Sequence, residues 1–281
     1  KMGMVLAFLE FAGITEHSVI QTPSYIEFGN RKFRDWKASG HGSSDAIKAI
    51  RESVDVYFYT LSQRAGIENM ASVLSQMGIG ELTGIDIPNE VKGILPSPEW
   101  KLRRYGEQWY GGDTITTSIG QGYFLSTPMQ IARYTALIAS GKLVTPHFAK
   151  DFNNEPASFE SKDVLSEFQK SKLDVLRKGM YQVCSVPGGT AYFRTQGTKV
   201  SLACKTGTAQ VVGIPQDIQR RVREADMEYF HRSHSWITAF LPYENPQYAV
   251  TILIEHGGSG GNGGPLLVKI ANKLKELGYV K

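Results

Sequence analysis

The stretch Lys205-Thr206-Gly207-Thr208 decides the fold when it is taken together with two earlier features of the chain. Lys-Thr-Gly alone occurs by chance in many proteins, so the order of the pieces carries the argument. Lys1 opens an apolar stretch, Ser53-Val54-Asp55 follows it, and Lys-Thr-Gly lies late in the chain on a β-branched run. This order predicts one cleft in which Lys1, Ser53 and Lys205 converge, with Thr206 and Thr208 on its rim.

Composition limits the class of protein. The chain has 281 residues, of which 41% are hydrophobic, and this suits an ordinary soluble core of one large domain or two small ones. The formal charge of +4 is small and the basic residues are scattered, so we expect no nucleic-acid partner. No run approaches the length of a membrane span.

The two cysteines, Cys184 and Cys204, exclude a disulfide framework and a cysteine-based zinc finger. Both lie in apolar surroundings in the sequence. We therefore interpret them as small core residues rather than as a bridge.

The first part of the chain is predicted to be mainly helical. Met2–Phe11 is apolar nearly all round, which is typical of a helix buried in the middle of a domain, and Gly13 ends it. Residues 14–43 are interpreted as an irregular, packed excursion. Ser44 or Asp45 can cap a helix that runs to about Glu52. Further helices are expected after Asp55, at 67–77, at 128–140 and at 168–184.

The last third of the chain changes character. Val200–Ala209, Ser235–Leu241 and Gln247–Glu255 are predicted strands, and the last two are joined by a hairpin-type connection. Pro265–Leu277 has one apolar stripe and closes the chain as a helix. The charged insertion 216–234 is interpreted as a solvated lid or loop helix in preference to a binding arm. The fold class is therefore α+β: a mainly helical part, 1–190, and antiparallel strands with a C-terminal helix, 191–281.

These residues support acyl transfer if a serine lies one helical turn before Lys1. That serine is not in the sequence. Because residues three apart share a helix face, the Lys1 side chain would lie beside its hydroxyl. A lysine acts as a base only in its neutral form, which burial and a nearby positive charge such as Lys205 favour. Ser53 would relay the proton to the leaving amine, and Asp55 would orient the network.

The strand residues suit the substrate. Lys205 and Gly207 share one face because strand side chains alternate, and Gly207 would let an extended peptide lie against the strand edge. The hydroxyls of Thr206 and Thr208 suit a terminal carboxylate. The backbone N–H of Thr208 and that of the expected serine would form an oxyanion hole.

Longer stretches support a family resemblance. The chain resembles the class B penicillin-binding proteins of the elongation type, from Lys1 to about Leu277. The Ser-x-Asp in place of the commoner Ser-x-Asn favours this type over the division-specific one. The resemblance is carried by Arg34-Asp35-Trp36-Lys37 with Gly40-His41-Gly42, Thr83-Gly84-Ile85-Asp86, Pro98-Glu99-Trp100-Lys101, Trp109-Tyr110-Gly111-Gly112-Asp113-Thr114, Gly120-Gln121-Gly122-Tyr123, Thr127-Pro128-Met129-Gln130, Gly189-Thr190-Ala191 and Lys205-Thr206-Gly207-Thr208-Ala209-Gln210.

The resemblance implies a penicillin-binding transpeptidase or serine β-lactamase-like fold, in which an antiparallel sheet is flanked by helices and joined to an all-helical subdomain. Residues 1–281 would form one transpeptidase domain that is incomplete at its N-terminus. The implied activity is a periplasmic DD-transpeptidase that needs no cofactor, acts on stem peptides ending in D-Ala-D-Ala and is acylated by β-lactams. The implied partners are a RodA-type rod-complex glycosyltransferase and an MreC-type periplasmic scaffold, with a single inner-membrane helix upstream.

Some family members bind zinc through two aspartates, a histidine and a cysteine. Here only Asp35 and His41 match, and two ligands make a poor site for a metal that takes four. We therefore predict no metal, and interpret His41 as a structural hydrogen-bonding residue. His231, His234 and His256 lack a defined ligand spacing and receive no metal role.

Two other functions stay open. A serine β-lactamase or β-lactam sensor shares the three motifs, but several glutamates between the second and third motifs lack a recognisable β-lactamase setting. A non-catalytic, partner-binding fragment is the other alternative, because the expected serine is absent from the sequence. Nitrocefin turnover separates a β-lactamase from a transpeptidase. The intact mass of the purified protein shows whether the serine is present, which tests the second alternative.

Overall fold

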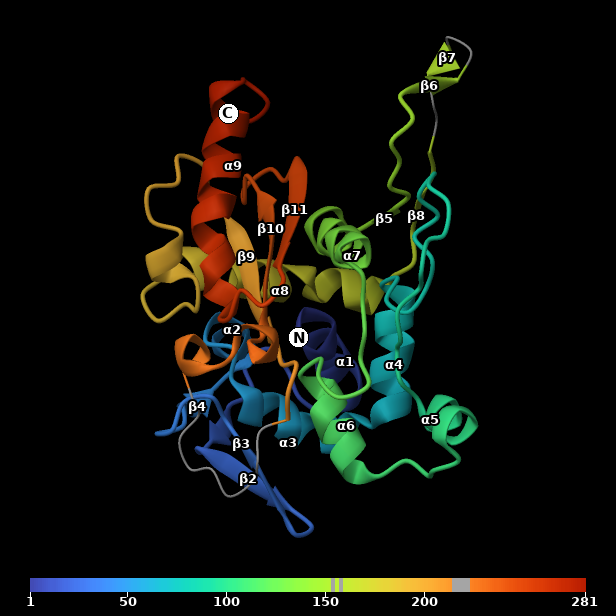
Figure 1. Cartoon of the computed structure of the whole chain (residues 1–281), viewed down its shortest axis with the longest axis vertical. Helices are drawn as coiled ribbons and strands as arrows, with labels where there is room; N and C mark the ends of the chain where they lie inside the picture. Colours follow the sequence, from blue (N-terminus) through green and yellow to red (C-terminus); the bar gives the residue numbers. More distant parts are fainter. Residues whose placement is uncertain (153–154, 157–158, 214–222) are drawn as a thin grey trace.

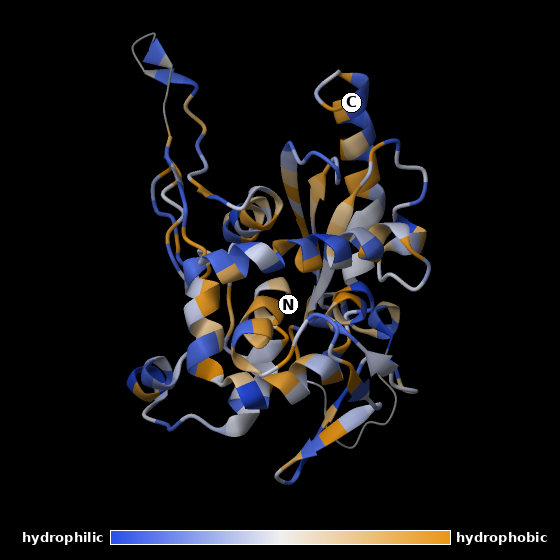
Figure 2. Ribbon diagram, turned by 180° about the vertical axis from the view of Figure 1, so that it is seen from behind, coloured by the Kyte–Doolittle hydropathy of each residue, from blue (hydrophilic) through white to orange (hydrophobic). Residues whose placement is uncertain are grey.

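Helix α1 (Met2–Phe11) runs through the middle of the helical part because it is apolar on every side. All its residues from Met2 to Leu9 are buried, and helices α3 (Asp55–Ala65), α4 (Ile67–Gln76) and α8 (Glu167–Ser185) pack around it. This computed structural model describes residues 1–152, 155–156, 159–213 and 223–281. Figure 1 places the N-terminus in the middle of the molecule, and Figure 2 shows the apolar colour of α1 there. The predicted buried helix is confirmed.

Capping residues set where other helices begin. The Asp45 side chain accepts a hydrogen bond from the Lys48 amide and starts α2 (Ala46–Arg51). Helix α7 (Pro128–Ser140) begins with a capping box formed by Thr127 and Gln130 and has proline in its first turn. Two helices were not predicted, because one is mostly exposed and the other is rich in Gly and Thr: α5 (Pro98–Tyr105) and α6 (Gly111–Ser118).

The three predicted strands are observed and form an antiparallel sheet of β9 (Ala203–Ala209), β10 (His234–Leu241) and β11 (Tyr248–Ile254), which lie in the order β11-β10-β9. Thr238 on one face shares a hydrogen bond with the Thr135 hydroxyl of α7, at 2.7 Å. Its neighbour Ile237 points to the other face, where the turn η4 (Gly260–Gly263) leads into α9 (Gly264–Glu276). Helices therefore cover both faces, and β9 is an edge strand of this sheet (Figure 1). The α+β class is confirmed.

Residues 14–43 correct the prediction of an irregular excursion. They form β1 (Ile20–Thr22) paired with β4 (Gly42–Ser44), and β2 (Tyr25–Phe28) paired with β3 (Arg31–Arg34). The β2–β3 hairpin turns at Gly29-Asn30, a two-residue loop of the type that favours hairpins. The strands are three or four residues long and largely exposed, so the sequence carries little alternation to reveal them.

An arm projects from the helical part next to α7. It contains the paired strands β5 (Leu143–Val144) and β8 (Ser161–Lys162), and further out β6 (Asp151–Phe152) and β7 (Glu155–Pro156). Figures 1 and 2 show that the tip stands away from the core. These two-residue strands were not predicted, because each is too short to show a pattern.

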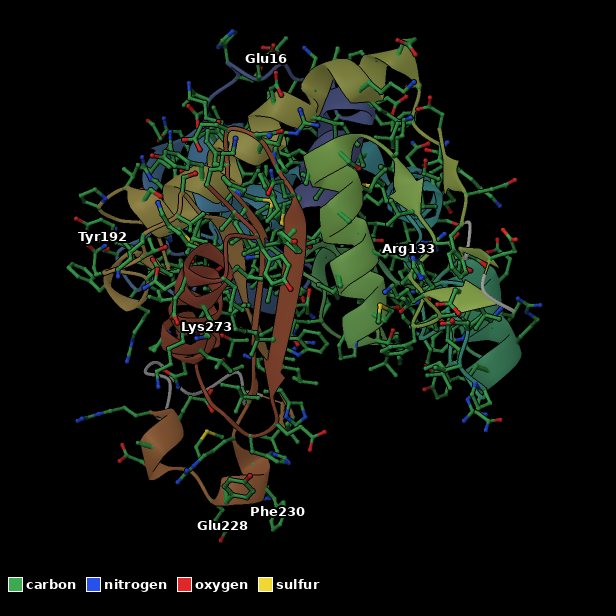
Figure 3. All side chains as sticks on the ribbon, turned by 90° about the horizontal axis from the view of Figure 1, so that it is seen from above. Glu16, Arg133, Tyr192, Glu228, Phe230 and Lys273 are labelled. Atoms are coloured by element: carbon green, nitrogen blue, oxygen red, sulfur yellow. A yellow bond between two sulfur atoms is a disulfide. The ribbon has the colours of Figure 1, made fainter. Side chains whose placement is uncertain are left out.

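The charged insertion 216–234 is described only from residue 223 onward; its residues 216–222 lie outside the described part. The described part holds two 3₁₀ turns, η2 (Glu224–Asp226) and η3 (Tyr229–His231). Phe230 is 73% exposed, and Figure 3 shows it with Glu228 at the outer end of this loop.

The cysteines correct another prediction, because Cys184 and Cys204 form a disulfide with a Cα–Cα distance of 5.9 Å. Helix α8 packs against β9, which brings the two buried residues together. An apolar sequence context is equally compatible with a bridge and with free thiols, so it could not decide. Within the described residues, no helix has the length and apolar character needed to cross a membrane.

Candidate active site

Three residues from distant parts of the chain meet at one hydroxyl. Lys1 precedes α1, Ser53 lies just before α3, and Lys205 is on β9. The Nζ atoms of Lys1 and Lys205 each lie 3.0 Å from Ser53 Oγ. A serine oxygen accepts two hydrogen bonds and keeps one proton to donate, so Ser53 can pass a proton between groups on its two sides. The predicted convergence of these three groups is observed.

The two lysines have different surroundings. Lys1 Nζ forms an ion pair of 2.6 Å with Asp55 Oδ1 and lies 5.0 Å from the centre of the Phe58 ring. Among the described residues, the hydrogen-bond partners of Lys205 are neutral: Ser53 Oγ, and the carbonyl oxygen of Thr206 at 2.8 Å. Burial, and then the charge of Lys1, hold the pKa of Lys205 well below its usual value, and Asp55 opposes this only in part. Lys1 thus pairs with a carboxylate, and its charge acts on Lys205, whereas the sequence argument had the charge of Lys205 acting on Lys1.

Ser53 has an uncommon backbone conformation. Its φ is 56°, in the left-handed region that residues with a Cβ seldom adopt. The Ser53 amide donates to the Ile50 carbonyl at 3.3 Å, and the Ser53 carbonyl accepts from Lys1 Nζ at 3.0 Å. Such conformations persist only where the surroundings hold them, and they gather at functional sites.

The β9 residues keep the alternation that the sequence predicts. Lys205 pairs with Thr238 and Gly207 with Trp236, so Lys205 and Gly207 face the same side. The Thr206 and Thr208 hydroxyls have partners in the chain, in the Thr190 hydroxyl at 2.6 Å and the Gly260 amide at 3.0 Å. The binding of a carboxylate by Thr206 and Thr208, and of a peptide along Gly207, stays a prediction.

Sequence reasoning gave no role to Gln121, which lies between α6 and α7. Its Nε2 donates to the Thr208 carbonyl at 2.8 Å, and so ties this loop to the end of β9. Gly120 and Gly122 on either side have φ values of 77° and 73°. A polar residue between two glycines that both need the left-handed region is the signal that could have indicated this contact.

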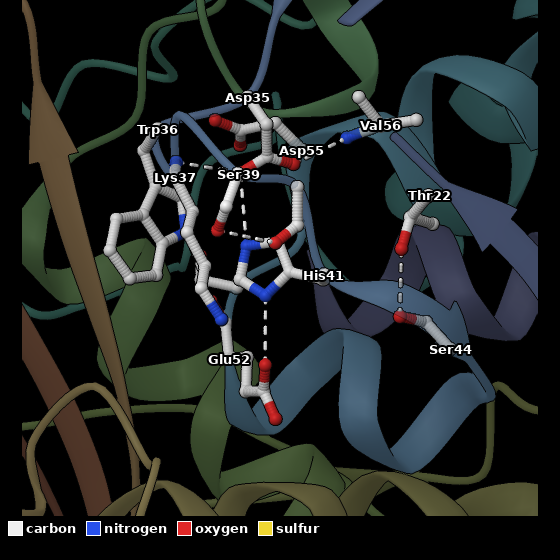
Figure 4. A network of polar contacts seen from close by, with 12 residues as sticks. Thr22, Asp35, Trp36, Lys37, Ser39, His41, Ser44, Glu52, Asp55 and Val56 are labelled. Atoms are coloured by element: carbon white, nitrogen blue, oxygen red, sulfur yellow. Dashed lines mark hydrogen bonds and ion pairs between the residues drawn. The ribbon is translucent and has the colours of Figure 1, made fainter. Parts of the chain in front are cut away.

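His41 lies between the carboxylates of Asp35 and Glu52 (Figure 4). Its Nε2 is 3.0 Å from Asp35 Oδ1, and its Nδ1 is 2.8 Å from Glu52 Oε2. The hydrogen-bonding role expected for His41 is thus observed, while Glu52 was not predicted. Both ring nitrogens are engaged, and in the described part of the chain no group of three or more His, Cys, Asp or Glu residues is arranged to hold a metal.

The pKa values of this group follow from its geometry. Burial alone would lower the pKa of His41, but the hydrogen bonds to Asp35 and Glu52 outweigh it and raise that pKa. Burial alone would raise the pKa of both carboxyl groups. Hydrogen bonds from His41, and from the Val56 amide to Asp35 and Arg51 to Glu52, lower both pKa values instead. These shifts and the two carboxylate partners favour an imidazolium at His41.

Known proteins resemble this chain along its whole length. Residues 1–276 match the model of the penicillin binding protein transpeptidase domain. The peptidoglycan D,D-transpeptidase MrdA of Haemophilus influenzae is 36% identical over 267 residues, which are 92% of this chain and 40% of that protein.

Solved structures agree with this match. Penicillin-Binding Protein (PBP2) from Helicobacter pylori, solved in complex with MreC, has a TM-score of 0.91 and 56% identity, covering 100% of this chain and 49% of that one. A chain from a peptidoglycan synthase complex, solved in a study of how polymerization and crosslinking are coordinated, has a TM-score of 0.80 and 26% identity, covering 97% and 44%. The chain thus spans about half the length of these relatives, or less.

Proposed function

Because the chain belongs to the penicillin-binding protein transpeptidase family, we propose that it is the catalytic domain of an elongation-type peptidoglycan D,D-transpeptidase. The observation that carries this proposal is the meeting of Lys1, Ser53 and Lys205 at one hydroxyl. Chance matches to short motifs would scatter these residues over the surface. Their order in the chain and their convergence at one hydroxyl support serine acyl transfer.

The first step is acylation. A serine three residues before Lys1 would lie on the same face of α1, close to Lys1 Nζ. Its oxygen attacks the carbonyl carbon between the two D-alanines, and its proton passes to the lysine. The C–N bond then breaks, Ser53 Oγ relays a proton to the leaving amine, and D-alanine departs. The product is a serine ester of the stem peptide.

The second step is transfer. The amine of a neighbouring stem peptide attacks the ester carbonyl and a new amide bond forms. The ester C–O bond breaks, and the proton lost by the amine returns to the serine oxygen. A β-lactam would enter the first step as a donor mimic and leave a stable ester. The same chemistry therefore accounts for cross-linking and for inhibition.

The edge of β9 suits the donor peptide. The peptide would add as a strand beside Gly207, with its terminal carboxylate near the Thr206 and Thr208 hydroxyls. The Thr208 amide and the amide of the serine would stabilise the oxyanion, and each such donor contributes on the order of a hundredfold to a thousandfold in rate.

We infer the setting of the whole protein from its relatives. A periplasmic domain behind a single inner-membrane helix would act beside an MreC-type scaffold and a RodA-type glycosyltransferase. The Helicobacter pylori relative solved with MreC supports the first partner, and the relative from a peptidoglycan synthase complex supports the second.

The test is acylation in a protein that carries a serine three residues before Lys1. We expect a fluorescent penicillin to label it once per molecule, and intact mass to show one stable adduct. Fast nitrocefin hydrolysis without a lasting adduct would favour a β-lactamase. No adduct and no turnover would reject both activities.

A further inference from the structure

The residues on either side of Ser53-Val54-Asp55 are tied to the same buried imidazole. Glu52 precedes the segment, and its Oε2 lies 2.8 Å from His41 Nδ1. Val56 follows it, and its amide donates to Asp35 Oδ2 at 3.0 Å. The other Asp35 oxygen lies 3.0 Å from His41 Nε2, so one chain of hydrogen bonds runs from Glu52 through His41 and Asp35 to Val56 (Figure 4).

This chain of contacts is shielded from water. The His41 side chain is 1% exposed and that of Asp35 is fully buried. A neutral imidazole has one donor and one acceptor nitrogen, so it could not donate to both carboxylates. An imidazolium donates to both, and it also separates the buried charge of Asp35 from the partly exposed charge of Glu52, which would otherwise repel each other across the ring.

Neighbouring groups fix the ends of the network. The Glu52 carbonyl accepts from Trp36 Nε1 at 3.0 Å, and Glu52 Oε1 accepts from Arg51 at 2.6 Å. The His41 carbonyl accepts from Lys48 Nζ at 2.6 Å. None of these contacts involves Lys1, Ser53 Oγ or Lys205. The network thus acts on the backbone around the site and does not touch its reacting atoms.

The segment between the ends needs this support. Ser53 is held in the left-handed region at φ 56°, and its own amide hydrogen bond is long at 3.3 Å. A rotation toward ordinary backbone angles would swing Ser53 Oγ away from the two Nζ atoms, each of which it meets at 3.0 Å. Fixing Glu52 and Val56 opposes that rotation.

We propose that Asp35, His41 and Glu52 are positioning residues that hold Ser53 in its strained conformation between the two lysines. The proposal rests on the proposed acyl transfer, and it assigns the network an effect on the acylation rate beyond its effect on stability. Loss of the imidazolium should leave a folded protein whose Ser53 samples other conformations and relays protons less often.

The experiment compares His41→Gln with wild type, both carrying the serine before Lys1. Acylation by a fluorescent penicillin is followed at increasing concentrations, which separates the limiting rate from the half-saturating concentration. Misplacement of a catalytic group by about 1 Å can cost on the order of a hundredfold, so we expect the limiting rate to fall by about ten- to a hundredfold with little change in half-saturation. The exposed His17→Gln is the matched control and should keep the wild-type rate.

The final amount of adduct separates positioning from stability. A purely structural role would lower the fraction of molecules that can be labelled and leave the limiting rate of the folded ones unchanged. If His41→Gln does not fold, Glu52→Gln serves in its place, because it keeps the side-chain length and an acceptor oxygen.

Full labelling at a lowered limiting rate supports the proposal. A higher limiting rate in Glu52→Asp than in Glu52→Gln would strengthen it. A wild-type limiting rate in the folded variant overturns it. A wild-type protein that is never acylated would instead overturn the proposed function.

Discussion

The molecule holds two clusters of ionisable side chains next to each other, and they differ in how their charges are arranged. In one, the amino groups of Lys1 and Lys205 share the Ser53 hydroxyl. In the other, the carboxylates of Asp35 and Glu52 share the His41 imidazole. In the second cluster each carboxylate faces the imidazole, whereas in the first two basic groups are brought together, and burial and the charge of Lys1 lower the pKa of Lys205. Two basic groups held close by the fold indicate a candidate site of chemistry, and the paired charges beside them indicate its support.

The largest expected effect is on acylation, from Lys205→Ala. This change removes a partner of the Ser53 hydroxyl and, in the proposed function, a positive element near the substrate carboxylate, so the rate should fall by about a hundredfold or more. Lys205 is only 6% exposed, not partly solvated as a cleft-lining lysine would be. Because its burial disfavours the charged form, its loss should not lower the melting temperature. A penicillin time course and a thermal melt check both, with the exposed Lys273→Ala as control; a wild-type rate would refute the role of Lys205.

An alanine substitution in the other cluster should lower stability as well as the acylation rate. Asp35→Ala leaves the His41 imidazolium without one partner and the buried Val56 amide without its acceptor. Removing one member of a buried pair costs about 3–5 kcal/mol of unfolding free energy. Denaturant unfolding measures this, and Asp174→Ala, at an exposed pair, should change little. Equal stability of Asp35→Ala and wild type would mean that the cluster contributes nothing to the fold.

A third variant probes the link between the two halves of the fold. The Cys184–Cys204 bridge closes a loop with a sequence separation of 20. Replacing both cysteines with serine should lower the free energy of unfolding by about 3 kcal/mol, mostly through the unfolded chain. The bridge lies outside both clusters, so the acylation rate should not change. A slower rate in the folded double variant would show that the bridge shapes the site.

The smallest effect is the pH dependence of stability. The raised pKa of His41 contributes stability below its unfolded value of about 6.5, and this contribution is lost as pH rises through the folded pKa. The lowered pKa values of Asp35 and Glu52 contribute stability above about pH 4, near the unfolded pKa of a carboxyl group. This contribution is lost as pH falls through the folded pKa values. The free energy of unfolding of the wild type, measured from about pH 4 to 9, should therefore decrease at the alkaline end. His41→Gln should flatten that decline, and an unchanged profile would contradict the assignment of the imidazolium.

The sequence was most informative where a pattern had one physical explanation. An apolar stretch such as Met2–Phe11 can only be buried, and Lys205-Thr206-Gly207 within a β-branched run predicts a strand with alternating faces. Together with Ser53, these features are enough to predict the cluster of lysines. The convergence of Lys1, Ser53 and Lys205 was predicted from the order of the motifs in the sequence. That order is present here, apart from the serine expected before Lys1.

The remainder depends on partners that are distant or ambiguous in the sequence. Glu52 is one of many glutamates until the fold places it against His41. Cysteines in apolar runs do not reveal whether they pair, and the two-residue strands of the arm show no periodicity. The Gln121 contact to Thr208 joins residues that are 87 positions apart, with only the flanking glycines to indicate it.

The most direct test is to locate a penicillin adduct by peptide mapping in protein that carries a serine three residues before Lys1. The lysine–serine–lysine cluster predicts one adduct, on that serine, forming at least about a hundredfold more slowly in Ser53→Ala because the proton relay is lost, which corresponds to about 2.7 kcal/mol. An adduct on another residue, or one that forms in Ser53→Ala at the wild-type rate, would contradict the claim that this cluster is the acylation centre.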